Sequence, residues 1–145
     1  MQEDSTLWRR YASDGWALLG LLLTRVLPYA WHRRRHPPAA AELDRAGMAG
    51  RQDGDTHVLR LRGAWQAGNL DSVRAGFAEA AAAGLEVRLD LSEVSFVDSA
   101  FIGLVLVLRG SLTRDGRELR VESVQAPVRR IFEYCCADFL LRERT

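Results

Sequence analysis

An acidic residue and a hydroxyl stand side by side where the most apolar segment of the chain begins. Asp98 and Ser99 directly precede the run Ala100-Phe-Ile-Gly-Leu-Val-Leu-Val-Leu108. Either side chain could cap a helix that starts here, because each has an oxygen that can accept from a free N–H of the first turn. The Ser99 hydroxyl could also be phosphorylated, which would add about −1.5 to −2 charges at pH 7. Both roles, helix cap and phosphorylation site, stay open for Ser99.

The other reactive side chains do not form a recognisable catalytic or metal-binding pattern. A triad of His57, Asp98 and Ser99 has the right residue types, but no G-x-S-x-G turn is present and adjacent Asp98 is badly placed to orient a histidine. The chain has no Lys and hence no Walker-type phosphate loop. His32 and His36 have i, i+4 spacing, but no Cys or carboxylate lies at a matching offset, which favours a solvated basic end. We expect no catalytic residue, no cofactor and no metal.

Composition and cysteine usage indicate a globular protein of a reducing compartment. The 145 residues are 48% hydrophobic and 27% charged, and the net charge of +1 argues against a nucleic-acid partner. Cys135 and Cys136 are adjacent and cannot build a disulfide framework. Cys135 is expected in the core, and redox sensing is an alternative for Cys136. Glu3 and Asp4 argue against a secretory signal peptide. We expect a bacterial cytoplasmic protein, or one placed peripherally on the inner membrane.

The near-neutral net charge of the whole chain conceals a basic first part. Residues 1–36 contain six Arg and three acidic residues, whereas residues 37–145 contain fourteen Arg and sixteen acidic residues. Between these parts, Pro, Gly and small residues are frequent, which is typical of a linker. The pattern predicts a helical, basic and apolar appendage at 1–36, a linker at 37–56 and a folded domain at 57–145.

The appendage combines an apolar helix with aromatic and basic flanks. The stretch from Gly15 to Trp31 is apolar apart from a few positions, but it is shorter than the roughly 20 residues that a spanning helix needs. Three interpretations remain open: packing on another protein domain, contact with the membrane interface, and a true membrane span. The residues expected to make the docking or membrane contact are Trp16, Tyr29, Trp31, Arg33, Arg34 and Arg35.

Residues 57–145 alternate between strand and helix patterns. Apolar residues recur at every second position in 57–62, 87–91 and 117–124, which predicts strands. Helices are expected over 69–83, 99–112 and 127–135, with Asn69 or Asp71 capping the first and Ser92-Glu93 acting as a turn after the second strand. This order predicts an α/β fold with a small, mostly parallel or mixed sheet covered by helices. Right-handed crossovers place the helix start at Ser99 at the carboxyl end of a strand.

The segment Val87-Arg-Leu-Asp-Leu-Ser-Glu-Val-Ser-Phe-Val-Asp-Ser99 resembles the signature of STAS domains, the family of anti-sigma-factor antagonists and sulfate-transporter tails. The resemblance extends over about 57–142 and includes the Pro-led helix that starts at Pro127. It implies a STAS-like fold and a non-catalytic, regulatory interaction with a protein such as an anti-sigma factor or a kinase. It also implies that Ser99 is the phosphorylated switch residue, and that partners contact Asp98, Ala100, Phe101 and Gly103.

One departure from the STAS pattern concerns the helix start. The family usually has Ser-Gly after the switch serine, and this chain has Ala100-Phe101. We expect the bulky Phe101 to hinder a partner that approaches this end of the helix.

The appendage carries a second, narrower resemblance. Leu7-Trp-Arg-Arg-Tyr11, the apolar helix and the basic end before Pro37 resemble the tail of WecB/TagA/CpsF-family glycosyltransferases. This implies an alternative function: a regulatory or docking part of such an enzyme in cell-envelope glycan or exopolysaccharide synthesis, with its catalytic domain as the partner. A STAS-like subunit of a lipid-transport complex is a third possibility.

Overall fold

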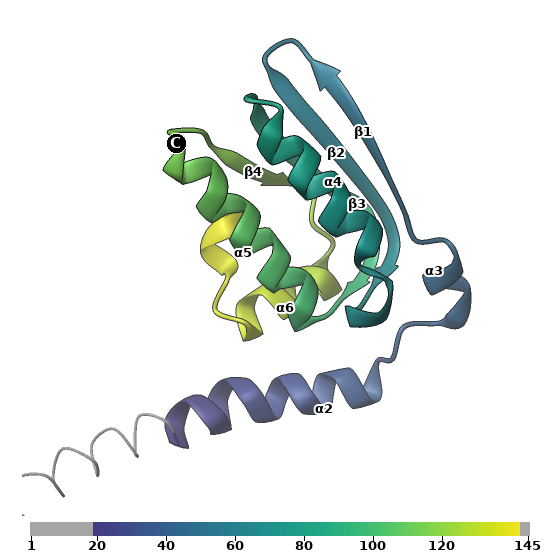
Figure 1. Ribbon diagram of the computed structural model, residues 1–145. Coiled ribbons are helices and arrows are strands. Elements are labelled where there is room, and N and C mark those ends of the chain that lie inside the picture. Colours follow the sequence, from purple (N-terminus) through teal and green to yellow (C-terminus); the bar gives the residue numbers. More distant parts are fainter. Residues whose placement is uncertain (1–18, 143–145) are drawn as a thin grey trace, which may run out of the picture. The chain divides into compact units, whose positions relative to one another are not determined.

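The computed structural model describes residues 19–142, and the chain divides into two units, residues 1–37 and residues 38–145 (Figure 1). Each unit is considered by itself. Trp16, which the sequence assigns to the docking or membrane contact, lies outside the described residues.

The described part of the first unit is helical from residue 19 to residue 35. It contains a π-helical turn, η1 (Leu22–Val26), followed by α2 (Leu27–Arg35). The widened turn lies immediately before Pro28, which has no N–H to donate back along the helix and crowds the preceding turn. None of the helices in residues 19–142 is both long enough and apolar enough to cross a membrane.

The second unit is built on a four-stranded mixed sheet in the order β1-β2-β3-β4. Strand β1 (Gly47–Asp53) pairs antiparallel with β2 (Thr56–Trp65), and β3 (Glu86–Val97) and β4 (Leu119–Glu122) continue the sheet in parallel. The predicted α/β class, with a small mixed sheet covered by helices and preceded by a helical segment, is confirmed.

Two helices cover one face of this sheet. Figure 1 shows α4 (Asp71–Ala82) and α5 (Ser99–Arg114) side by side across the strands. The core between the layers contains alternate residues of β2 and β3 and one face of each helix; its fully buried members include Leu59, Leu61, Leu89, Leu91, Val73, Phe101, Val105 and Leu112. A third helix, α6 (Ala126–Tyr134), buries Val128, Ile131 and Phe132, and the short 3-10 turn η3 (Asp138–Leu141) follows it.

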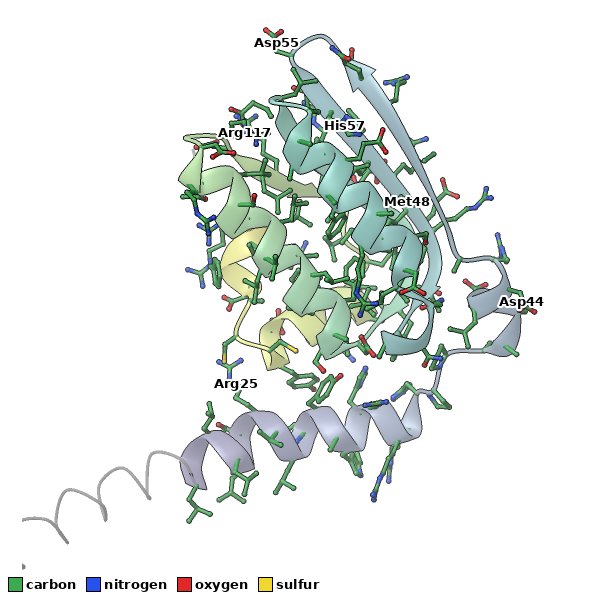
Figure 2. All side chains as sticks on the ribbon, viewed as in Figure 1. Arg25, Asp44, Met48, Asp55, His57 and Arg117 are labelled. Atoms are coloured by element: carbon green, nitrogen blue, oxygen red, sulfur yellow. The ribbon has the colours of Figure 1, made fainter. Side chains whose placement is uncertain are left out.

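The start of the domain differs from the prediction. The expected linker at 37–56 contains a short helix, α3 (Ala40–Asp44), and the whole of β1. The signal was the dipeptide Gly54-Asp55: it forms the two-residue loop that joins β1 to β2, and Gly54 has φ of 59° at the first loop position, where hairpins favour Gly. Figure 2 shows Asp55 at the tip of this hairpin. Strand β1 was missed because it is a mostly exposed edge strand without apolar alternation.

Strand β3 is also longer than predicted. Ser92-Glu93 is not a turn, because β3 continues through both residues to Val97. The register with β2 jumps from Arg60↔Asp90 to Arg62↔Glu93, which marks a β-bulge at this point. The bulge shifts the alternation, so that Val94 enters the core while Phe96 stays half-buried. A single strand therefore carries the chain directly to Asp98.

Candidate functional site

The candidate site is the first turn of α5 and the surface that continues from it. Helix α5 begins at Ser99, and Asp98 is its N-cap: the backbone N–H of Phe101 donates to Asp98 Oδ1 at 3.0 Å. The interpretation of Ser99 as the cap is therefore wrong, since the neighbouring carboxylate has that role. Ser99 is the first helical residue and is exposed.

Asp98 is buried, with 4% of its surface exposed, and it ties two segments together. Its second oxygen, Oδ2, accepts from the N–H of Ala67 at 2.9 Å, and its own N–H donates to Trp65 O at 3.1 Å. Both carboxylate oxygens are thus engaged inside the domain. The expectation that Asp98 touches a partner directly is wrong: this buried residue holds the start of α5 and the neighbouring loop in place.

The segment held by Asp98 is the loop between β2 and α4, which the sequence interpretation overlooked. It contains a 3-10 turn, η2 (Ala67–Asn69), closed by a hydrogen bond from Gln66 N to Asn69 Oδ1 at 2.8 Å. Asn69 Nδ2 also donates to Ala64 O at 3.0 Å. Asn69 or Asp71 was expected to cap α4, but the Asn69 side chain serves this loop, Asp71 is the first residue of the helix, and α4 has no side-chain cap.

An exposed strip runs along α5 from the switch position. We call it the α5 strip; it consists of Ser99, Gly103, Leu106, Val107 and Gly110, which recur at helical spacing on one side and are all exposed except the half-buried Gly103. Val107 is 70% exposed, which is unusual for a large apolar residue. A Cβ added at Gly103 would meet nothing within 4 Å, so the surface between Ser99 and Val107 is open. Ala100, at the border of the strip, is half-buried.

The predicted role of Phe101 as a partner-binding or obstructing residue is wrong. Its side chain is fully buried, and its ring packs against Phe77 of α4 with 6.5 Å between centroids. The helical period explains this, because position 101 lies on the same side as the buried residues Val105, Leu108 and Leu112. Phe101 anchors α5 to α4 and leaves the α5 strip clear.

The residues that could have formed a catalytic triad are not brought together. His57 lies near the start of β2 (Figure 2), whereas Asp98 and Ser99 follow the end of β3, where Trp65 at the end of β2 pairs with Val97. The Asp98 carboxylate is already engaged by backbone N–H groups. Within residues 19–142, no group of three His, Cys, Asp or Glu side chains is arranged to hold a metal ion.

The two cysteines lie at the end of α6. Cys135 is half-buried and Cys136 is exposed, and both are free thiols. Burial raises the pKa of the Cys135 thiol, and the neighbouring Cys136 and Asp98 raise it further. A raised thiol pKa lowers the fraction of nucleophilic thiolate at neutral pH. Cys135 is therefore poorly suited to redox or covalent chemistry.

A mixed four-stranded sheet, helices on one face and an acid–hydroxyl pair at the start of α5 define a STAS-type domain. The family model described as "Mlab, STAS domain" matches residues 48–142, and the chain belongs to this family. The match starts inside β1 and so includes the strand that the sequence interpretation had assigned to a linker.

Solved structures share the fold at low sequence identity. The unphosphorylated anti-sigma factor antagonist SpoIIAA is 22% identical, with a TM-score of 0.59; the matched region covers 68% of this chain and 89% of the SpoIIAA chain. SpoIIAA of Bacillus in its phosphorylated form is 20% identical, with a TM-score of 0.55 and coverage of 68% and 92%. An anti-sigma factor antagonist from Mycobacterium paratuberculosis is 14% identical, with a TM-score of 0.61 and coverage of 66% and 82%. No curated protein gave a significant match.

Proposed function

We propose that this protein is a non-catalytic STAS-type regulatory module that docks a protein partner on the α5 strip. The observation that carries the proposal is the side of α5 that runs from the exposed Ser99, past the half-buried Gly103, where an added Cβ would have room, to the exposed Val107; it starts at a phosphorylatable hydroxyl. An exposed apolar side chain beside small residues lets a partner approach the helix backbone closely. The buried anchors Asp98 and Phe101 keep this surface rigid.

Ser99 is the proposed switch. Phosphorylation would place about −1.5 to −2 charges at the first position of α5, where the helix dipole favours negative charge. Asp98 would oppose that charge, but its carboxylate is held by the N–H groups of Phe101 and Ala67. The modification therefore changes the charge and size of the docking surface without unfolding the domain. SpoIIAA, which shares the fold, has been solved in a phosphorylated and an unphosphorylated form.

The partner we propose is an anti-sigma factor or a kinase-like protein, in the cytoplasm. This follows from the STAS resemblance of Val87–Ser99 and from membership of the family. The link to a WecB/TagA/CpsF-type glycosyltransferase depends on residues 7–11 and the appendage, and it stays a prediction. The same is true of a lipid-transport complex as the partner. All of these partners would be recovered by one experiment.

That experiment is quantitative affinity purification with mass spectrometry from the native host. Wild type is compared with Ser99→Ala, Ser99→Asp and Val107→Arg. Glu79→Arg, on an exposed position of α4, is the matched control that adds an Arg to the neighbouring helix. We expect one prey to be lost with Val107→Arg, altered with Ser99→Asp and retained with Ser99→Ala and Glu79→Arg. Its identity then decides between the partner classes.

Two results would overturn the proposal. If every prey is insensitive to Val107→Arg, the α5 strip is not the docking surface. Alternatively, Ser99→Asp could leave the affinity of the purified prey unchanged in titration, which would remove the switch. Circular dichroism and thermal unfolding of each variant show that the domain is folded before affinities are compared.

A further inference from the structure

The described helix of the first unit presents an apolar stripe to solvent. Leu19, Leu23, Val26, Leu27 and Ala30 recur at intervals of three and four residues, so they gather on one side of the helix, and the exposed Leu21 and Leu22 extend the apolar surface beyond it. All five are exposed, and the four large side chains have exposed fractions of 42% to 54%. Moving apolar side chains of this size out of water is favourable, so we expect the stripe to bind an apolar surface.

Positive charge continues the stripe at its carboxyl end. Arg33 and Arg34 are exposed, and both lie in line with the stripe: Arg33 follows Val26 by seven residues and Ala30 by three, and Arg34 follows Leu27 by seven residues and Ala30 by four. Arg35 follows, with its guanidinium carbon 4.0 Å from the centre of the Trp31 ring. Trp31 itself is 58% exposed. Apolar surface, an exposed indole and three arginines therefore follow one another along about 25 Å of helix.

This sequence of environments matches one side of a lipid bilayer. The hydrocarbon takes up Leu and Val, the interface favours Trp, and anionic headgroups attract Arg. An amphipathic helix that packs on a protein domain places its charges opposite the apolar stripe. Here Arg33 and Arg34 instead lie on the same side as the stripe, at its end. They would therefore face the same surface that the stripe binds.

We propose that the helix of residues 19–35 binds an anionic phospholipid surface, with the apolar stripe in the outer hydrocarbon and Arg33–Arg35 at the headgroups. The helix lies in the interface and does not cross the bilayer. Arg25, in the π-helical turn, lies about 80–100° from the edge of the stripe and is not part of the proposed headgroup contact. This binding is independent of the proposed docking on the α5 strip.

The test is co-sedimentation of the full chain with vesicles of phosphatidylcholine, with and without phosphatidylglycerol. We expect binding to the anionic vesicles, and a loss of binding as salt concentration rises. Charge reversal of Arg33, Arg34 and Arg35 to Glu should weaken binding roughly 100-fold or more, since each basic residue near the surface contributes roughly fivefold. The matched control reverses Arg114, Arg129 and Arg130, three exposed arginines of the STAS domain, and should bind like wild type.

A second pair of variants tests the stripe. Leu23→Asp introduces a charge into the stripe, whereas Thr24→Asp introduces the same charge about 80–100° farther around the helix, off the stripe. Leu23→Asp should lose vesicle binding and Thr24→Asp should largely keep it. Ser99→Asp should bind vesicles like wild type, so that failure of the switch and failure of membrane binding are distinguishable.

Three outcomes would overturn the inference. They are no binding to anionic vesicles, equal weakening by the two triple reversals, and equal effects of Leu23→Asp and Thr24→Asp. If Leu23→Asp instead releases a protein prey while wild type ignores vesicles, the stripe docks on protein and the membrane assignment is wrong.

Discussion

Asp98 and Ala67 are 31 residues apart in the chain, and the carboxylate of the first accepts the backbone N–H of the second at 2.9 Å. This bond links the start of α5 to the loop between β2 and α4. The other oxygen of the same carboxylate caps α5 at the N–H of Phe101. One buried side chain therefore fixes both segments next to Ser99, and the position of the proposed switch depends on it.

Replacing Asp98 by Ala should be strongly destabilising. The substitution removes a helix cap, worth typically about 1 kcal/mol, and the hydrogen bond from the N–H of Ala67 to a charged carboxylate, worth about 1.5–3 kcal/mol. We expect the free energy of unfolding, measured with urea, to fall by about 2–4 kcal/mol. Asp98→Asn retains one carbonyl oxygen and should lose about half as much. Equal stability of Asp98→Ala and wild type would show that these two bonds contribute nothing.

The sequence allowed the central α/β pattern to be predicted because alternation is strong where strands have one buried face. Leu59 and Leu61 in β2, and Leu89 and Leu91 in β3, are fully buried as their period of two requires. Strand β1 has only Met48 as a large apolar residue and lies at an edge. Its position is set by pairing with β2 and by the turn at Gly54, so hydrophobic periodicity could not reveal it.

The site was predicted in outline but not in detail. The D-S pair located the start of α5, yet either residue could serve as the cap, and only the three-dimensional arrangement shows that the carboxylate bonds to Phe101 N. The bond from Ala67 joins residues distant in sequence and leaves no local signal. Phe101 is different: its spacing from Val105 and Leu108 already indicated the core, and that signal was stronger than the comparison with the family's Ser-Gly pair.

Phe101 should matter for stability and not for partner exclusion. Because the ring is fully buried against Phe77, Phe101→Ala removes core contacts and should cost about 3–5 kcal/mol of unfolding free energy. The docking surface gains no space from this change. Partner capture by the folded fraction should therefore stay at the wild-type level, as measured by titration normalised to folded protein. A clear gain in affinity would show that Phe101 does obstruct the surface.

Gly63 of β2 packs so closely against the backbone at the end of α3 that there is no room for a side chain. Its φ is 79°, and an added Cβ would lie 2.6 Å from Glu42 O and 2.7 Å from Ala46 N. Gly54→Ala is the matched control, because Gly54 also has positive φ, 59°, but open space around it. The control should cost about 1–2 kcal/mol from backbone strain alone. Gly63→Ala should cost clearly more in urea unfolding; equal costs would mean that α3 shifts away freely.

Asp90 makes the stability of the domain dependent on pH. Burial by itself raises the pKa of this carboxyl, but hydrogen bonds from the backbone and side chain of Ser92 and the ion pair with Arg60, 3.0 Å away, outweigh burial and lower it. A lowered folded pKa means that the stabilisation is complete above the unfolded pKa. It is lost as pH falls from about 5 through the folded value.

The variant Asp90→Asn should therefore lose roughly 1 kcal/mol of unfolding free energy at neutral pH and lose less than wild type on acidification. Urea titrations across this pH range measure both effects. Asp53→Asn is the control, since Asp53 is 62% exposed and its ion pair with Arg51 spans 3.6 Å. Its pH profile should match that of wild type. Parallel profiles of Asp90→Asn and wild type would remove Asp90 as the source.

The two thiols at the end of α6 should differ in reactivity. Burial raises the pKa of Cys135, and the neighbouring Cys136 and Asp98 add to the effect, so that little thiolate is present at neutral pH. Cys136 is exposed, so the reagent can reach its thiol, whereas the Cys135 thiol is half-buried. Timed alkylation with iodoacetamide, followed by mass spectrometry of Cys135→Ser and Cys136→Ser variants, should therefore modify Cys136 faster than Cys135. In denaturant the two rates should become equal, because the difference comes from the fold; a difference that persists after unfolding, or equal rates in the native protein, would contradict the assignment.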